Sequence, residues 1–391
     1  MTKITTGLEN LITARPGWMS KNRLGLLSNP ASIDSRYRHA SKLIHRYFPD
    51  QLTALFSPQH GFFGEKQDNM IESADMVDPK LKIPVFSLYG KTRVPSPQML
   101  DHIDVLIVDL IDVGTRVYTF TSTLSYCLEA CARLNKRVVV LDRPNPINGL
   151  QVEGNCLSMT LSSFVGRYPI PMRHGLTMGE YAAYINHSFN INCPLEVIPM
   201  KGWNRRMYFQ HTGIPWVPPS PNLPTPASAI VYPGQVIWEG TNISEGRGTT
   251  LPFEQFGAPF VDIDKVLSFM GGPHIPGGIL RPATFEPTSN KWAGQTCNGF
   301  CLHITDPYQF KPYATSLKLL SAIIYHHKNQ FQWKQPPYEY EWEKRPFDMI
   351  VGNDIIRQQL ENAEDIDNIQ KKWAPALTEY QSAARKFHLY K

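Results

Sequence analysis

Short, continuous apolar runs alternate with helical patterns over the first 200 residues, and this alternation constrains the fold more than any other feature of the sequence. A strand that is apolar along its whole length is typical of a parallel sheet that helices cover on both faces. The predicted strands occupy residues 23–28, 52–57, 105–110, 137–141 and 195–199. The predicted helices between them occupy residues 37–48, 121–134 and 177–189. The fold class is therefore α/β with a parallel sheet.

The second half of the chain has a different pattern. Helices are predicted at residues 262–270, 315–327, 354–363 and 366–380, and a strand at 299–304. A chain of 391 residues rarely folds around one core. We therefore expect a larger α/β domain over residues 1–250 and a smaller α+β domain over residues 251–391.

Proline is enriched, with 33 residues, and is concentrated at residues 215–233 and 273–287. Proline fixes φ and lacks a backbone donor, which disfavours helix interiors and central strands. We therefore predict ordered loops in both stretches.

Composition excludes several classes of function. The 39 basic residues exceed the 34 acidic ones only slightly and are scattered, so nucleic acid is not an expected partner. No apolar run is long enough to span a membrane, and residues 1–7 lack the apolar stretch of a secretory signal, so we expect a cytoplasmic protein. The six cysteines lack the spacing of a zinc site, and we expect no metal.

Polar segments follow three of the predicted strands, where parallel sheets bind ligands. The first segment places His60 and Glu65 on a loop bounded by glycines. A histidine there can act as a general acid or base, or it can simply hold the loop.

The other two strand ends carry arginines. Asp112 and Arg116 either pair with each other or bind a ligand's hydroxyl or carboxylate group. Arg143 and Asn145 lie between prolines, in a stretch that suits either a rigid site or a plain turn.

A dense stretch, Trp238–Thr249, contains three glycines beside Glu239, Asn242, Glu245 and Arg247. Its spacing matches neither a phosphate-binding loop nor a dinucleotide fingerprint. Either it lines a site, or its carboxylates pair with Arg247 and see no ligand. The nucleophile elbow and the His-Glu-x-x-His zinc motif are absent from the sequence. Carboxylate, amide, arginine and aromatic side chains remain, a set that suits a polyhydroxylated ligand.

Six motifs occur in the order found in one family. They are Ser57–Gly61, Asp112–Thr119, Leu141–Pro146, Pro171–Gly175, Ser220–Thr225 and Glu239–Thr249. With them the chain resembles the exo-β-N-acetylmuramidases, a glycoside hydrolase family long described as a domain of unknown function. The resemblance covers nearly the whole chain.

The resemblance implies a Rossmann-like domain without a nucleotide, a smaller C-terminal domain and an active site in the cleft between them. It implies release of terminal N-acetylmuramic acid from peptidoglycan fragments, with an amino sugar or muropeptide as substrate and no cofactor. Arg116, Arg143 and Arg247 are the candidates to bind the lactyl carboxylate of this sugar. The other expected substrate-binding residues are Gln59, Asp112, Tyr118, Asn145, His174, Asn222, Asn242 and Glu245.

The chain departs from the family pattern at two positions. Gln59 stands where the family has Glu before His-Gly, and Met70 stands where a second acid usually follows. We therefore expect Glu65, desolvated by Phe62 and Phe63, to act as the proton donor opposite Glu239 or Glu245, with His60 beside them. The alternatives are a carbohydrate-binding member that has lost the acid, and a small-molecule enzyme of another class.

Overall fold

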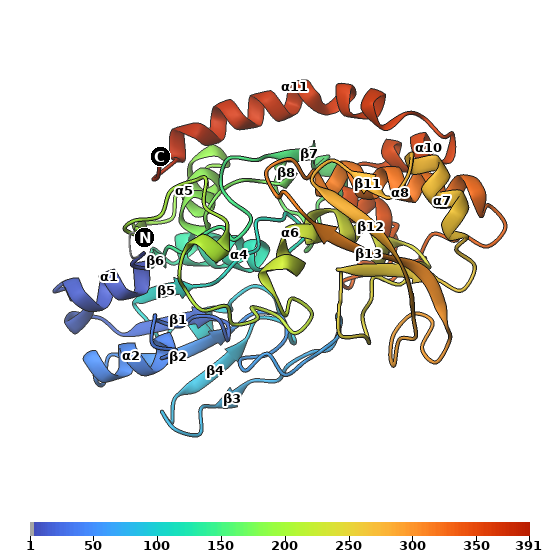
Figure 1. The fold of residues 1–391 in the computed structure, drawn as a ribbon. Helices are drawn as coiled ribbons and strands as arrows, with labels where there is room; N and C mark the ends of the chain where they lie inside the picture. The colour runs from blue at the N-terminus through green and yellow to red at the C-terminus, as the bar shows by residue number, and fades with distance from the viewer. Residues whose placement is uncertain (1–3) are drawn as a thin grey trace.

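The computed structural model describes residues 4–391 (Figure 1). Residues 1–3, which belong to the N-terminal segment without a predicted secretory signal, lie outside the described residues. Among the described helices, none combines the length and the apolar character needed to cross a membrane.

A seven-stranded sheet forms the centre of the first part of the chain, in the order β3-β4-β2-β1-β5-β6-β9. The strands are β1 (Leu24–Ser28), β2 (Leu52–Ser57), β3 (Met76–Val77), β4 (Pro84–Ser87), β5 (Val105–Asp109), β6 (Arg137–Leu141) and β9 (Leu195–Ile198). All neighbours pair in parallel except the edge strand β3. From the central β1 the order runs outward both ways, which is the doubly wound Rossmann order. The predicted α/β fold is confirmed.

Helices connect these strands and cover the sheet (Figure 1). They are α1 (Gly7–Ala14), α2 (Ala40–Tyr47), α3 (Pro97–Leu100), α4 (Phe120–Arg133) and α5 (Met178–Ser188). Helix α5 begins where the sequence predicts it, because the Thr177 side chain accepts from the Glu180 amide and the Glu180 carboxylate accepts from the Thr177 amide. A small antiparallel pair, β7 (Glu153–Cys156) and β8 (Pro171–Arg173), lies outside the main sheet.

The second part of the chain contains a four-stranded antiparallel sheet with helices beside it (Figure 1). Its strands are β10 (Gln255–Ala258), β11 (His274–Ile275), β12 (Gly278–Phe285) and β13 (Cys297–Ile304). The helices are α6 (Pro226–Gln235), α7 (Ile263–Met270), α8 (Pro312–His326), α9 (Pro346–Val351), α10 (Asp354–Glu361) and α11 (Ile366–Ala384). One hydrophobic cluster contains side chains from both sheets, and α11 runs back toward the first part of the chain (Figure 1). The domain boundary near residue 250 stays a prediction.

Residues 215–225 form the predicted loop, but helix α6 and strands β11 and β12 occupy much of the remaining proline-rich sequence, where the prediction of loops is wrong. Helix α6 has Pro226 in its first turn, where a missing backbone donor costs no hydrogen bond. Strand β12 contains Pro282, but β11 covers only Gly278 and Ile279. The rest of β12 is therefore an edge strand, where proline is tolerated.

Candidate active site

Two adjacent spaces that share lining residues form the candidate site. The inner recess is about 30 Å³, which leaves room for only a few water molecules, and its lining includes Gln59, His60 and Glu339. The outer cavity is about 560 Å³, within the range of small-molecule sites, and its lining includes Trp292 and Trp333. Four side chains line both spaces: Asn69, Glu239, Arg247 and Tyr338.

The loop after β2 carries His60 into the inner recess in a constrained backbone conformation. His60 has a φ of 78°, and Gly61 follows with a φ of 83°. A positive φ is costly for a residue with a side chain and persists where the surroundings enforce it. The His60 Nδ1 lies 2.8 Å from the Lys66 carbonyl oxygen, which can only accept, so Nδ1 carries the proton and Nε2 is an acceptor. Burial lowers the pKa of His60 to about 4, so the ring is neutral at pH 7.

Glu239 is an ionised carboxylate held by donors. It follows Trp238 in the short 3₁₀ helix Val236–Gly240. Its carboxylate accepts from Arg247 Nη2 at 2.7 Å, from the Tyr338 hydroxyl at 2.5 Å and from Asn69 Nδ2 at 3.2 Å. Burial alone would raise its pKa, but the charge of Arg247 and these hydrogen bonds outweigh burial and hold the pKa below its usual range.

Glu245 supports the same arrangement from the outer cavity. Its carboxylate pairs with Arg247 Nε at 3.2 Å and with Lys291 Nζ at 2.7 Å. Glu239 and Glu245 both pair with Arg247, as one of the two alternatives from the sequence has it, and all three also line the outer cavity, as the other has it. Pairing and lining a site are therefore not alternatives here.

Glu339 is the second carboxyl group of the inner recess, and the sequence analysis missed it. It lies in a strained turn, with φ values of 48° at Glu339 and 63° at Tyr340. Its carboxyl oxygens accept from the Gln59 amide at 3.0 Å and from the Tyr89 hydroxyl at 2.6 Å. Burial raises the pKa of Glu339, and these hydrogen bonds offset the rise only in part.

Gln59 links this carboxyl group to the first part of the chain. Its side-chain oxygen accepts from the Thr119 hydroxyl at 2.5 Å, which fixes the orientation of the amide toward Glu339. The position that departs from the family pattern is therefore in hydrogen-bond contact with a carboxyl group supplied from 280 residues further along the chain.

Three other predicted residues also line the site. Tyr118 and Asn222 line the inner recess, and burial raises the pKa of Tyr118. Asn242 lines the outer cavity, but its side chain is occupied by the backbone of Gln330 and Gln332 at 2.8 and 3.0 Å.

Glu65 does not line either space, and the predicted pairing of Glu65 with Glu239 or Glu245 across a cleft is wrong. Its carboxylate folds back on its own loop, accepts from the Phe63 amide at 3.2 Å and is exposed. Phe63 is itself 57% exposed, so it cannot desolvate Glu65 as predicted.

Arg116 is a structural residue rather than a carboxylate-binding one. It is 1% exposed and donates to the backbone carbonyls of Asn155, Ile170 and Ile350 at 2.9–3.0 Å. It makes no pair with Asp112. Arg116 therefore joins three separate segments of the fold through their carbonyl groups. The prediction that it binds the lactyl carboxylate of the substrate is wrong.

Asp112, His174 and Asn145 also serve the fold. Asp112 accepts from the Gly114 amide and lies 3.0 Å from His174 Nε2, in a pair that is almost fully buried. Asn145 donates to the Leu176 carbonyl at 2.9 Å. None of the three lines the inner recess or the outer cavity, so the predicted contacts with substrate are not found.

Arg143 fills the crevice where a Rossmann fold binds its nucleotide. The strand order reverses between β1 and β5, and ligands of such folds bind beyond that point. Here the Arg143 guanidinium pairs with the Asp109 carboxylate at the end of β5 and donates to the Ile33 carbonyl at 2.9 Å. The predicted role of Arg143 in carboxylate binding is wrong, because its donors are used within the fold.

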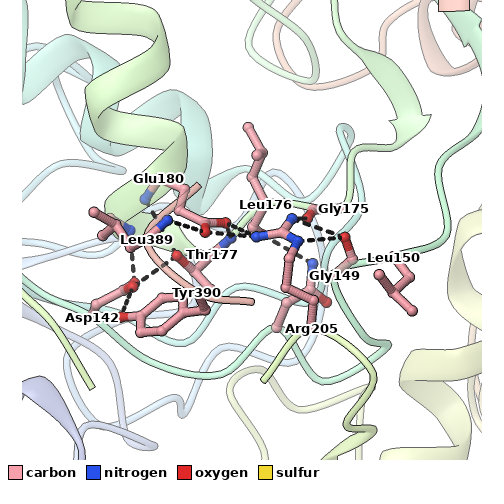
Figure 2. Close-up of polar contacts among 12 residues, drawn as sticks. Asp142, Gly149, Leu150, Gly175, Leu176, Thr177, Glu180, Arg205, Leu389 and Tyr390 are labelled. Carbon is pink, nitrogen blue, oxygen red and sulfur yellow. Dashed lines mark hydrogen bonds and ion pairs between the residues drawn. The ribbon is translucent and has the colours of Figure 1, made fainter. Parts of the chain in front are cut away.

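The end of β6 anchors the C-terminal segment instead of a ligand (Figure 2). The buried Asp142 carboxylate accepts from the Tyr390 hydroxyl at 2.6 Å and from the Thr177 hydroxyl at 2.8 Å. Burial raises the pKa of Asp142 to about 6. Beside it, Glu180 accepts from the Leu389 amide at 2.9 Å, and its two carboxylate oxygens accept from Arg205 Nη1 at 2.6 and 2.8 Å.

The site therefore contains a carboxyl group with a raised pKa, a carboxylate with a lowered pKa and a neutral histidine around one small recess. Two titratable groups whose pKa values are separated by their surroundings are typical of acid–base catalysis. Within residues 4–391, no three His, Cys, Asp or Glu side chains come together as a metal-binding group.

Comparisons with known proteins identify the family of the chain. Two family models match, the N-terminal part of the exo-β-N-acetylmuramidase NamZ at residues 24–227 and its C-terminal part at residues 230–390. The chain is 39% identical over 388 residues to the peptidoglycan β-N-acetylmuramidase NamZ of Bacillus subtilis, covering 99% of this chain and 92% of that protein.

Two solved structures of DUF1343 family proteins from Bacteroides fragilis have the same fold. One is 32% identical with a TM-score of 0.89 and covers all of both chains. The other is 27% identical with a TM-score of 0.77 and covers 100% of this chain and 99% of that one. The chain belongs to the exo-β-N-acetylmuramidase NamZ family.

Proposed function

We propose that the protein is a glycoside hydrolase that releases terminal N-acetylmuramic acid from peptidoglycan fragments. The observation that carries the proposal is the pair Glu239 and Glu339, two buried carboxyl groups with opposite pKa shifts that line one recess. The activity of the 39% identical peptidoglycan β-N-acetylmuramidase supports the same reaction. Hydrolysis of a glycosidic bond normally uses two such groups.

In this proposal Glu339 is the acid and Glu239 the carboxylate. Glu339, with its raised pKa, gives its proton to the glycosidic oxygen as the bond between that oxygen and the anomeric carbon breaks. The ionised Glu239 stabilises the positive charge that develops on the sugar ring. Water supplies a hydroxyl group to the anomeric carbon and returns one proton to the carboxyl pair. His60, with Nε2 free to accept, orients a hydroxyl group or this water.

The outer cavity suits the sugar. Trp292 and Trp333 offer apolar surface to a sugar face, and Arg247 and Lys334 offer positive charge to a lactyl carboxylate. Arg247 is mostly buried, and its Nη1 has no hydrogen-bond partner anywhere in residues 4–391. Of the three arginines considered for the lactyl group, Arg247 is therefore the one retained.

The direct test compares wild-type protein on chromogenic β-glycosides of N-acetylmuramic acid and N-acetylglucosamine. Release from the first and not the second supports the proposal. If the protein binds the N-acetylmuramic acid glycoside but hydrolyses neither glycoside, the result would instead support the carbohydrate-binding alternative. Gln59, which stands in place of the family's Glu, is the reason to consider that alternative. The cytoplasmic location stays a prediction.

Arg247→Lys is expected to weaken binding of free N-acetylmuramic acid by roughly 10- to 100-fold, because lysine has no donor in the place of the free Nη1 of Arg247. N-acetylglucosamine lacks the lactyl group and serves as the control ligand, with an expected change under threefold. Isothermal titration calorimetry on both sugars measures the effect. Equal losses for the two sugars would contradict the assignment of the lactyl group to Arg247.

Two tyrosine variants are expected to move opposite limbs of a bell-shaped profile of kcat/KM against pH. Tyr338→Phe removes a donor from ionised Glu239, raises its pKa and moves the acidic limb to higher pH. Tyr89→Phe removes a donor from Glu339, raises its pKa and moves the alkaline limb to higher pH. Each shift should be about one to two pH units, and each variant is the control for the other. A shift of the same limb in both variants would contradict the assigned roles.

A further inference from the structure

Arg93 packs against Tyr340 in the strained turn that carries Glu339, and its environment is unusual. Its guanidinium carbon is 4.0 Å from the centre of the Tyr340 ring, 4.8 Å from that of Tyr89 and 5.4 Å from that of Phe164. Within the described chain, its Nε and Nη2 are buried and have no hydrogen-bond partner. Buried arginine donors usually form hydrogen bonds, whereas two donors of Arg93 have none. The side chain is held instead by contacts between its charge and aromatic rings.

The rings that Arg93 contacts are those that flank Glu339. Tyr89 donates its hydroxyl to the Glu339 carboxyl group, and Tyr340 is the next residue in the strained turn. The Tyr340 hydroxyl also donates to the Met70 carbonyl at 3.1 Å, and the Met70 amide donates to Tyr89 at 3.0 Å. Arg93 therefore contacts the two tyrosines that join the turn to the first part of the chain.

We propose that Arg93 is a positioning residue for the reaction: it clamps Tyr89 and Tyr340 by cation–π contacts, and so holds the Glu339 turn in place, while its charge acts on the Glu339 carboxyl group. The inference deepens the proposed function and rests on it for the role of Glu339. Cation–π contacts of this kind are stabilising without competing for the carboxyl oxygens.

The charge environment of Glu339 supports this role. The titratable and charged groups that face it are Tyr89 and Arg93 beyond β4, Tyr232 on α6, Glu239, and Tyr338 and Tyr340 on its own turn. Burial and the negative charge of Glu239 both raise the pKa of Glu339, and the positive charge of Arg93 opposes them. Removing that charge therefore raises the pKa of Glu339 and moves the alkaline limb of activity to higher pH.

The test uses the full-length protein with Arg93→Met and Arg93→Lys. The Glu339 carboxyl group is titrated by ¹³C NMR and assigned by its absence in Glu339→Gln. Arg93→Met is expected to raise this midpoint by roughly one unit. It is also expected to lower kcat roughly tenfold with little change in KM, because the proton donor is misplaced. Arg93→Lys keeps the charge but not the planar stacking, so the midpoint should stay near the wild-type value while kcat recovers only in part.

Arg167→Met is the matched control. Arg167 lies 3.7 Å from the centre of the Tyr126 ring, which stacks on Phe164 on the same aromatic cluster. Arg167→Met should change neither the titration midpoint of the Glu339 carboxyl group nor kcat. The proposal is overturned if Arg93→Met leaves both quantities at their wild-type values, or if Arg167→Met reproduces its effects. Absence of hydrolysis by the wild type would overturn the proposed function instead, and the NMR titration would still decide whether the charge of Arg93 acts on Glu339.

Discussion

Glu339→Gln is expected to lower kcat on an N-acetylmuramic acid β-glycoside by roughly 10²- to 10⁴-fold, the usual contribution of a general acid. Glutamine keeps the size and the hydrogen-bonding oxygen of the side chain but has no proton of the required acidity. The loss should fall on kcat, because the change removes an interaction that matters only as the bond breaks. Steady-state kinetics of the purified variant measure it.

Glu343→Gln is the matched control, because Glu343 lies four residues away on the exposed side of the same segment. It should leave kcat within twofold of wild type. A second variant tests the chemistry directly. Gln59→Glu combined with Glu339→Gln exchanges the two groups across a 3.0 Å contact and should recover part of the lost rate. Wild-type rates in Glu339→Gln alone would contradict the assignment of Glu339 as the acid.

Arg205→Met is expected to lower the free energy of unfolding by about 3–5 kcal/mol, because it leaves Glu180 buried and unpaired. Arg205 forms an ion pair with the fully buried Glu180. The Arg205 guanidinium also donates to the Gly149 carbonyl at 2.8 Å (Figure 2). Methionine fills much of the volume but replaces none of these donors.

Urea denaturation followed by circular dichroism measures the loss. Arg206→Met is the matched control, since Arg206 is the next residue and is exposed. Its change should stay within about 0.5 kcal/mol, as for most surface substitutions. Equal losses in the two variants would contradict the energetic role of the buried ion pair.

The parallel sheet could be predicted because its signal is local. The predicted strands from residue 23 to residue 199 are mostly apolar, and the observed strands β1, β2, β5, β6 and β9 fall within them. Helix α6 could not be predicted from proline content alone, since a proline in the first turn favours a helix start rather than preventing it.

The candidate site could be predicted only in part. The Gln59–His60 loop and the Trp238–Thr249 stretch combine glycine, charge and aromatic residues, and both reach the site. Arg116 and Arg143 have similar local surroundings, but their donors meet carbonyls and a carboxylate brought close by distant segments. Glu339 follows the prolines at 336 and 337 and lies between two tyrosines, a signal similar to that of the Trp238 stretch. Its raised pKa depends on burial, which local sequence does not report.

The separation between Gln59 and Glu339 also determines when activity can arise during synthesis. The sheet strands and most residues of the inner recess come from the first 250 residues, whereas the proposed acid comes from residue 339. Contacts between residues so far apart in the sequence form late, since a long loop must close before they are made. A nascent chain, or a fragment that ends before residue 339, can therefore contain the whole parallel sheet and still lack the proton donor.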